Sequence, residues 1–277
     1  MARQLINCHM HSVLCGHATG TINEMVQAAI AAGLAGTIFT EHLPLPHEID
    51  PHYGVSMRPE DLSGYVETLL RLRRQHPELT LIVGGECDWL SHDPQETVRS
   101  VHRAHLAGVE VILGSVHMLD GWAFDSPDEV EVWESHNIEE VWEQYFTQWI
   151  LAVRSGLFDV MSHADLVKKF AFYPRDREQY YEEAARVAGE AGVLCEVSTA
   201  GLRYPCNELY PAPRFIELLR DAGVEFTLST DAHSVAQIDY ELEATADFLL
   251  SLGIERVALP LGRGSKEHKE IRWFSLR

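Results

Sequence analysis

Short apolar segments alternate with longer amphipathic segments along this chain. The apolar segments are rich in β-branched residues and show no strict alternation of polar and apolar positions, which is typical of strands that are buried on both faces. They predict strands at residues 3–8, 36–40, 79–85, 109–115, 158–162, 193–197 and 225–230. We expect helices between them, because the intervening segments repeat their apolar positions at helical spacing.

The clearest helical pattern covers residues 59–76, with Pro59 near the predicted first turn. Glycines precede several predicted strands, at positions typical of helix ends: Gly33, Gly108, Gly192 and Gly223. Repeated strand–helix units predict a parallel sheet. Seven or eight such units without a nucleotide-binding glycine motif favour an α/β barrel over an open sheet, and a barrel of this size fits one domain over residues 1–277.

Composition narrows the possible partners. Hydrophobic residues make up 46% of the chain, enough for a large core, and the net charge is −20. Such an acidic protein lacks the basic surface of a nucleic-acid or anionic-membrane binder. A small anionic substrate is still compatible with this charge, because bound divalent metal ions reverse the local field. The sequence does not indicate an oligomeric state.

The cysteines and the apolar segments indicate a cytoplasmic protein. The five cysteines are odd in number and form no CxxC pair, which favours a reducing compartment and a role as small buried residues. Neither a signal region nor an apolar segment long enough to span a bilayer is expected.

Histidines and carboxylates follow almost every predicted strand. They are His9, His11, His42, Glu86, His117, His163, Asp231 and His233, and His17 lies in the first predicted loop. A parallel barrel brings the carboxyl ends of its strands to one mouth, so these distant residues should meet. The pairs His9-x-His11 and Asp231-x-His233 alternate with period two, and each can project to one side of an extended segment. Imidazoles and carboxylates are ligands of zinc, manganese and iron.

A single histidine beside a strand is more often an ordinary core or surface residue than a metal ligand. The complete set is harder to explain in this way, because burying so many titratable groups without metal would be costly. The other eight histidines lie in polar stretches, on helix faces or in loops and are not expected to bind metal: His47, His52, His76, His92, His102, His105, His136 and His268.

These motifs resemble those of the PHP (polymerase and histidinol phosphatase) superfamily. The matching segments occur in order along the chain: His9-Met10-His11, Thr40-Glu41-His42, Gly85-Glu86, Gly114-Ser115-Val116-His117, Ser162-His163-Ala164-Asp165 and Ser229-Thr230-Asp231-Ala232-His233. Within the superfamily, residues 14–20, 114–125 and 198–203 are most similar to the histidinol-phosphate phosphatases. One departure is Glu41, where the family often has Asp; we expect it beside the ligands rather than among them.

The resemblance implies a distorted seven-stranded (β/α) barrel and three divalent metal ions. By motif position, His9, His11, Glu86 and Asp231 would hold the first metal. Glu86 would bridge to a second metal at His117 and His163, and His17, His42 and His233 would hold the third. The resemblance also implies hydrolysis of L-histidinol phosphate to L-histidinol and phosphate, in histidine biosynthesis. Zinc, iron and manganese all suit these ligands.

We expect a hydroxide bridging the metals to attack phosphorus in line, without a phosphoenzyme. Glu86, Asp231 and His233 are the expected catalytic residues. Among other substrate contacts, Arg203 is the best candidate for the phosphate, with a surface ion pair as the equally weighted alternative. Lys168 and Lys169 are weaker candidates for the same role.

Two long connections follow strands, at residues 43–58 and 118–137, and long loops in a compact domain are usually functional. Trp122 and Phe124 in the second connection are candidates for packing on the substrate imidazole, and Asp125 for contacting its amine. Core packing or closure of the loop explains them equally well.

Two alternatives remain open. The chain could be a PHP-type phosphoesterase for another small phosphomonoester or for nucleic-acid ends, although its acidity disfavours nucleic acid. It could also be a catalytically silent metal-binding module, although retention of all nine candidate ligands disfavours this.

Overall fold

The computed structural model describes residues 3–263 and 269–277. Seven parallel strands form one sheet in sequence order: β1 (Ile6–Asn7), β2 (Gly36–Phe39), β3 (Thr80–Asp88), β4 (Val111–Ser115), β5 (Val160–Met161), β6 (Leu194–Ser198) and β7 (Phe226–Ser229). Each strand pairs with the next, and the central strands are buried on both faces. The predicted strands are therefore confirmed, with different ends.

The first and last strands approach each other and nearly close the sheet into a barrel. The backbone N–H of Cys8 donates to the carbonyl of Leu228 at 2.9 Å. Further along, the side chain of Asn7 connects the two ends of the sheet. Its Oδ1 accepts the N–H of Thr230 at 3.1 Å, and its Nδ2 donates to Thr230 Oγ1 at 2.7 Å. The strand β1 itself is shorter than the predicted strand at residues 3–8, because only Ile6 and Asn7 pair with β2. The expected distorted (β/α)7 barrel is confirmed.

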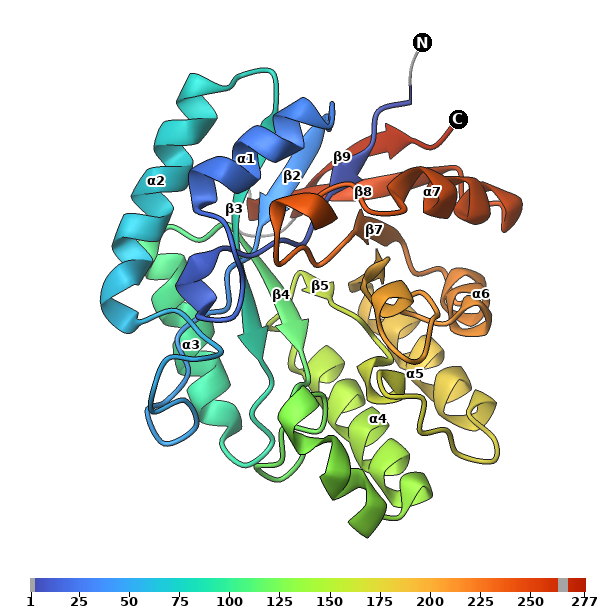
Figure 1. The fold of residues 1–277 in the computed structure, drawn as a ribbon. Coiled ribbons are helices and arrows are strands. Elements are labelled where there is room, and N and C mark those ends of the chain that lie inside the picture. The colour runs from blue at the N-terminus through green and yellow to red at the C-terminus, as the bar shows by residue number, and fades with distance from the viewer. Residues whose placement is uncertain (1–2, 264–268) are drawn as a thin grey trace.

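Helices surround the strands (Figure 1). In the described residues they are α1 (Ile22–Ala31), α2 (Leu62–Gln75), α3 (Pro94–Ala107), α4 (Ile138–Ser155), α5 (Glu178–Ala191), α6 (Pro213–Asp221) and α7 (Leu242–Ser251). The helix predicted from Pro59 begins with a 3-10 turn, η2 (Pro59–Asp61), and continues as α2. Gly108 and Gly192 end α3 and α5 in the left-handed conformation, at φ +104° and +63°, which glycine adopts without strain.

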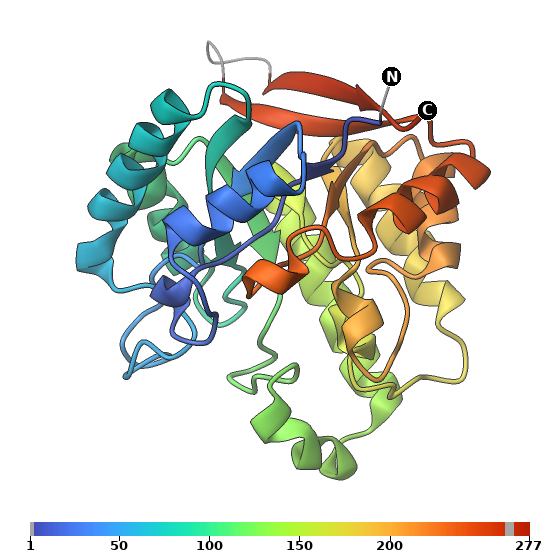
Figure 2. The ribbon, with the colours of Figure 1, turned by 45° about the horizontal axis from the view of Figure 1, so that its top comes forward.

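A C-terminal hairpin that the sequence pattern did not predict covers the amino end of the barrel. It consists of β8 (Arg256–Arg263) and β9 (Lys269–Ser275), which pair antiparallel. Leu259 of β8 packs so closely on Gly36, at the start of β2, that a Cβ there would lie 2.7 Å from it. Figure 2 shows the hairpin across one end and the segment after β4 at the other. The carboxyl ends of the strands are therefore the accessible mouth.

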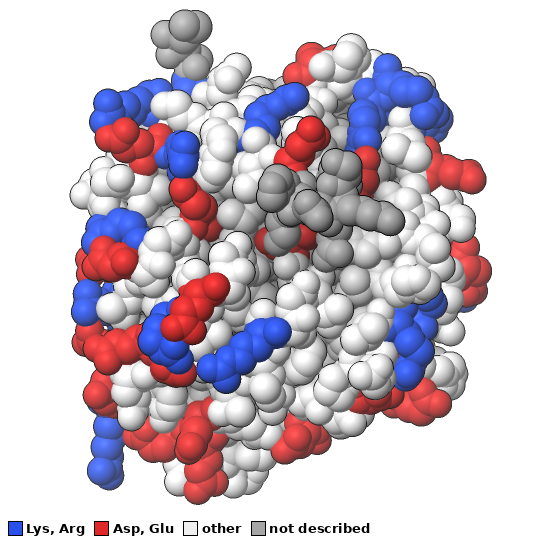
Figure 3. Space-filling view, turned by 180° about the vertical axis from the view of Figure 1, so that it is seen from behind, with Lys and Arg blue, Asp and Glu red and all other residues white. Residues whose placement is uncertain are grey.

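The molecular surface carries mixed charge. In the view of Figure 3, acidic and basic side chains are interspersed, and no continuous basic surface is visible on this face. In the described part of the chain, none of the helices combines the length and apolarity needed to cross a membrane. All five cysteines are free and buried, in agreement with their predicted role as core residues.

Candidate metal centre

Glu86 stands at the centre of the predicted ligands. Its Oε2 lies 3.1 Å from His9 Nε2, 3.2 Å from His42 Nδ1 and 3.4 Å from His11 Nε2. Its Oε1 lies 2.9 Å from His163 Nε2 and 3.7 Å from His117 Nε2. Sequence analysis placed Glu86 just after a strand, but β3 continues to Asp88 because Glu86, Cys87 and Asp88 still pair with β4. The carboxylate thus projects from a rigid strand between two groups of histidines.

Asp231 occupies the other side of the first group. Its Oδ1 lies 3.2 Å from His11 Nε2, 3.6 Å from His9 Nε2 and 3.4 Å from His233 Nδ1. Asp231 has φ +50°, and His163 has φ +22°. Such values cost free energy in residues with a side chain and cluster at functional sites, where the surrounding structure maintains them.

The remaining histidines form a third group nearer the surface. Nε2 of His17 lies 3.0 Å from Nε2 of His233. Potential ligand atoms of His17, His42 and His233 all lie within 4.8 Å of one another, and the same holds for His9, His11 and Asp231. The structure therefore brings all nine predicted residues together at the barrel mouth.

Three further carboxylates contact the imidazoles from behind. Glu196 Oε1 lies 2.8 Å from His9 Nδ1, and Asp88 Oδ1 lies 2.8 Å from His117 Nδ1. Glu41 Oε1 lies 3.5 Å from His11 Nδ1, and its Oε2 accepts the N–H of Ser12 at 3.0 Å. Glu41 was expected beside the ligands, whereas Glu196 and Asp88 were missed. Two sequence features could have identified them. Glu196 is an acidic residue inside an apolar strand, and Asp88 follows Glu86 by two positions, so both side chains can project to the same side of the strand.

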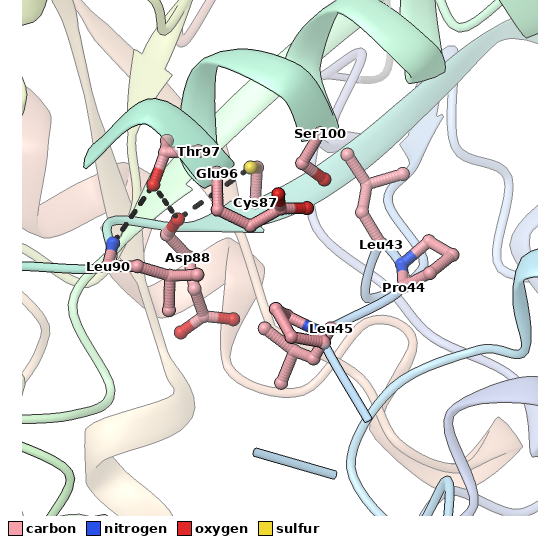
Figure 4. A pocket seen from close by; sticks show the side chains of 10 residues that line it. Leu43, Pro44, Leu45, Cys87, Asp88, Leu90, Glu96, Thr97 and Ser100 are labelled. Carbon is pink, nitrogen blue, oxygen red and sulfur yellow. Dashed lines mark hydrogen bonds between the residues drawn. The ribbon is translucent and has the colours of Figure 1, made fainter. Parts of the chain in front are cut away.

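Glu41 and Glu196 are fully buried and Asp88 nearly so. Figure 4 shows a small pocket lined by Asp88 between β3, α3 and residues 43–46, with a volume of about 10 Å³. There, Thr97 of α3 donates to the backbone carbonyl of Asp88 at 3.0 Å. This pocket has room for little more than a water molecule. The pocket is therefore too small to bind a substrate.

The histidines of the cluster differ in the direction in which their pKa is shifted. Burial lowers the pKa of His11, but the nearby carboxylates of Asp231 and Glu41 outweigh it and raise the pKa to about 9. Burial lowers the pKa of His117 as well, and Asp88 raises it to about 10. Burial and the neighbouring His11 instead lower the pKa of His233 to about 3. Neighbouring carboxylates therefore determine the direction of the pKa shift at His11 and His117, whereas burial and a neighbouring imidazole determine it at His233.

The cluster fits divalent cations. Both ring nitrogens of His11, Nδ1 of His163 and Oδ1 of Asp231 are buried without a hydrogen-bond partner. Burying polar atoms unpaired is costly, and cations bound among them would satisfy several at once. Nitrogen and carboxylate-oxygen donors suit zinc, manganese and iron. The described histidines outside this set do not join it; His105, for example, contacts the carbonyl of Val109. His268 lies outside the described residues.

Comparison with known proteins identifies the family. The PHP domain family matches residues 7–200, which include His9 through His163 of the cluster. The chain belongs to the PHP domain family. A relative from Deinococcus radiodurans, named a probable histidinol-phosphatase, is 34% identical over 85% of this chain and 89% of the relative. One from Schizosaccharomyces pombe, with the same name, is 27% identical over 94% of this chain and 92% of the relative.

The fold also matches a solved structure. A histidinol phosphate phosphatase from Lactococcus lactis, in complex with zinc, L-histidinol and phosphate, has a TM-score of 0.77 at 18% identity. The match covers 92% of this chain and 96% of the other chain. At this identity the likeness concerns the fold.

Arg203 lies at the edge of the cluster of histidines and carboxylates, beside Asp231. It ends η5 (Ala200–Arg203), which follows β6. Its Nη2 donates to the backbone carbonyls of Thr230 and Asp231, each at 2.9 Å, and its guanidinium packs over the ring of Tyr240. Its Nη1 is buried and has no hydrogen-bond partner. Arg203 is therefore part of the site wall rather than of a surface ion pair.

The structure does not support the substrate-binding assignment of Lys168. Its side chain is fully buried, with Nζ 2.9 Å from Asp165 Oδ2 and 3.2 Å from Glu208 Oε2. It also donates to the carbonyl of Leu209 at 2.7 Å. Lys168 therefore joins two loops inside the protein. The sequence could not separate it from Lys169, which lies one residue further along.

Lys169 instead reaches the mouth. Its Nζ lies 3.1 Å from Asp125 Oδ2 and over the ring of Tyr204 at 4.5 Å. Burial raises the pKa of Asp125, but Lys169 and then His117 outweigh it and lower the pKa below the ordinary value. The loop at residues 118–137 thus contributes a charge beside the cluster of histidines and carboxylates.

The aromatic residues of that loop pack mainly against each other. Trp122 stacks on His136 at 4.4 Å and meets Trp133 edge to face at 5.1 Å. Phe124 is fully buried against Trp133 and Tyr145, so the suggestion that it packs on a substrate ring is wrong. Trp122 is only partly buried and remains a candidate. Its packing favours the alternative in which the loop's aromatic residues build its own core.

Proposed function

We propose that this chain hydrolyses L-histidinol phosphate to L-histidinol and phosphate. The observation that carries the proposal is the cluster of histidines around Glu86 and Asp231 at the barrel mouth. The relatives named probable histidinol-phosphatases match nearly the whole chain. A protein of the same fold holds zinc, L-histidinol and phosphate. Together these support a metal-dependent phosphomonoesterase with a small substrate.

We assign three divalent cations to the groups described above, with zinc, iron or manganese as the candidates. His9, His11, Glu86 and Asp231 would hold the first, Glu86, His117 and His163 the second, and His17, His42 and His233 the third. Such cations lower the pKa of water, neutralise phosphate oxygens and stabilise the leaving alkoxide. Glu86, Asp231 and His233 are the proposed catalytic residues.

The protein groups would position substrate and water. Asp231 has a buried Oδ1 without a hydrogen-bond partner, so it is placed to accept a hydrogen bond from the attacking water. Arg203 presents a free Nη1 and is the proposed ligand of the phosphate. Lys169 and Asp125 together line the opposite side of the mouth. Trp122 is kept as a candidate contact of the imidazole.

The compartment and partners follow from the same features. Five free, buried cysteines fit a reducing cytoplasm. The net charge of −20 disfavours nucleic acid and is compatible with a small phosphate as the partner where bound cations reverse the local field.

A phosphate-release assay tests the proposal. The metal-loaded protein is incubated with L-histidinol phosphate, mononucleotides, sugar phosphates and an aryl phosphate. We expect the highest kcat/KM with L-histidinol phosphate. A preference for another phosphomonoester would replace the proposed substrate, and no turnover of any compound by fully metal-loaded protein would favour a silent metal-binding module.

A further inference from the structure

The groups that contact the imidazoles from behind differ across the cluster. In the first group, Glu196 stands behind His9 and Glu41 behind His11. In the second, Asp88 stands behind His117. The third group differs: Nδ1 of His17 faces the backbone carbonyl of Cys15, and Nδ1 of His233 faces that of Asp231, each at 3.1 Å. His233 Nδ1 also lies 3.4 Å from Asp231 Oδ1, a carboxylate assigned to the first group, whereas His17 Nδ1 faces a neutral carbonyl. In the second group, Nδ1 of His163 has no hydrogen-bond partner, so the contrast rests on His17.

The third group also lacks a carboxylate of its own. His42 contacts Glu86 through Nδ1 at 3.2 Å, but both oxygens of Glu86 already face the histidines of the first two groups. The first group is also more deeply buried than the third. The side chains of His9 and His11 have no exposed surface, whereas that of His233 is 24% exposed and His17 is exposed. Solvent and chelators can therefore reach the third group first.

These differences all lower the expected cation affinity of the third group. A carboxylate behind a ligating imidazole fixes the ring and raises its basicity, and its loss typically weakens metal binding about 10–100-fold. A third cation would also lie beside two others, with only neutral imidazoles to offset the repulsion. The neutral partner of His17, the absence of a carboxylate assigned to the third group and the exposure of His17 and His233 all disfavour cation binding at the third position.

We propose that the position formed by His17, His42 and His233 binds its cation more weakly than the other two and exchanges it with solution. The inference rests on the metal centre of the proposed function and adds an order of affinity to it. The first two positions form a permanent centre. The third makes the activity of the enzyme dependent on the free metal concentration.

Stepwise metal removal tests this order. The metal-loaded protein is dialysed against increasing chelator, and the ions per chain are counted by inductively coupled plasma mass spectrometry. We expect two steps, with about one ion per chain lost at a chelator activity at least ~10-fold lower than the rest. Loss of all ions in a single step would overturn the proposal.

Two variants assign the steps to residues. His17→Ala should abolish the early step and leave the late step in place. Asp88→Asn keeps the shape of the side chain but removes its charge. The ions of the late step should therefore be lost at a chelator activity about 10–100-fold lower than in the unchanged protein. His102→Ala, at an exposed position of α3, is the matched control and should change neither step. Loss of the late step in His17→Ala protein, with circular dichroism unchanged, would refute the assignment.

The metal counts also separate this inference from the proposed function, because they require no substrate. Two-step metal loss in a protein that does not hydrolyse L-histidinol phosphate would leave the order of affinity standing and remove the proposed function. Rapid hydrolysis of L-histidinol phosphate by a protein that loses its ions in one step would support the proposed function and overturn the order of affinity.

Discussion

Glu196 and His9 meet inside the barrel through a hydrogen bond of 2.8 Å between Oε1 and Nδ1, although 187 positions separate them in the sequence. The other oxygen of Glu196 accepts the backbone N–H of His163 at 2.7 Å. One fully buried side chain on β6 therefore orients a ring after β1 and holds the positive φ of a residue after β5. Glu196 thus connects a ligand of the proposed first metal position with a ligand of the proposed second.

Replacing Glu196 by Gln should weaken metal binding while preserving the fold. The amide has nearly the same volume, but it carries no charge and cannot accept both hydrogen bonds at once. We expect affinity for zinc to fall by about 10–100-fold, measured by competition with a chromophoric chelator. Ser229→Ala, which removes only a hydroxyl that donates to Glu196 at 2.6 Å, is the control and should have a smaller effect. Unchanged affinity in the Gln variant would exclude this positioning role.

Glu86→Gln should have the largest effect on turnover. Both oxygens of Glu86 face histidines of different groups, so the loss of its charge affects two metal positions. We expect kcat to fall by at least ~10²-fold, with far-ultraviolet circular dichroism unchanged. The phosphate-release assay measures this loss. A near-normal kcat with full metal loading would remove Glu86 from the site.

Lys168→Met should destabilise the protein instead of altering catalysis. The substitution leaves Asp165 buried without its cation, and breaking a buried ion pair typically costs about 3–5 kcal/mol. Urea denaturation measures the change in the free energy of unfolding. The control is Arg214→Met, which breaks an exposed pair with Glu178 and should cost within about 1 kcal/mol. Unchanged stability with a raised KM would restore Lys168 to the substrate site.

Metal binding should release protons at neutral pH. Burial lowers the pKa of His11 and His117, but acidic neighbours raise them to about 9 and 10, so both rings hold a proton at pH 7.5 in the metal-free protein. Ligation requires neutral imidazole, and zinc must displace these protons. Burial also lowers the pKa of His9, but Glu86 and Glu196 outweigh it and raise that pKa well above the ordinary value. Calorimetry in buffers of different ionisation enthalpy should therefore show release of about three protons. Apparent affinity should rise as pH increases toward 9, and a flat profile from pH 7 to 9 would contradict these pKa directions.

The sequence predicted the barrel and the nine clustered residues because both depend on a local rule. Buried parallel strands are continuous apolar segments, and their carboxyl ends converge. The residues behind the cluster were harder to predict. Glu196 faces the barrel interior from the middle of β6, and only the three-dimensional arrangement shows that His9 needs a partner there.

Other differences have equally specific causes. Lys168 and Lys169 are adjacent in the sequence, and the 3-10 turn η4 (Leu166–Lys168) turns the first inward while the second reaches the mouth. The hairpin of β8 and β9 follows the last barrel strand and packs across the opposite end. Its position depends on long-range contacts such as that of Leu259 with Gly36, which no local pattern encodes.

Arg203→Ala should reduce kcat/KM for L-histidinol phosphate by roughly 10²-fold, the scale of one lost charge-assisted contact of about 2–3 kcal/mol. Two backbone carbonyls hold its Nη2, so the free Nη1 points from a fixed guanidinium beside Asp231. A contact with the phosphoryl oxygens should strengthen as they gain charge during attack. The loss should therefore be similar for an aryl phosphate, which carries the same phosphoryl group.

Steady-state kinetics on both substrates, compared with an Arg203→Lys variant, decides the role of this side chain. Lysine retains the charge but cannot span two carbonyls and a phosphate in one plane, so we expect only partial recovery. A loss confined to L-histidinol phosphate would show that Arg203 recognises the leaving group. Unchanged kinetics on both substrates would show that its two hydrogen bonds only support the turn at Asp231. The phosphate would then require another ligand, for which Lys169, paired with Asp125, is the next candidate.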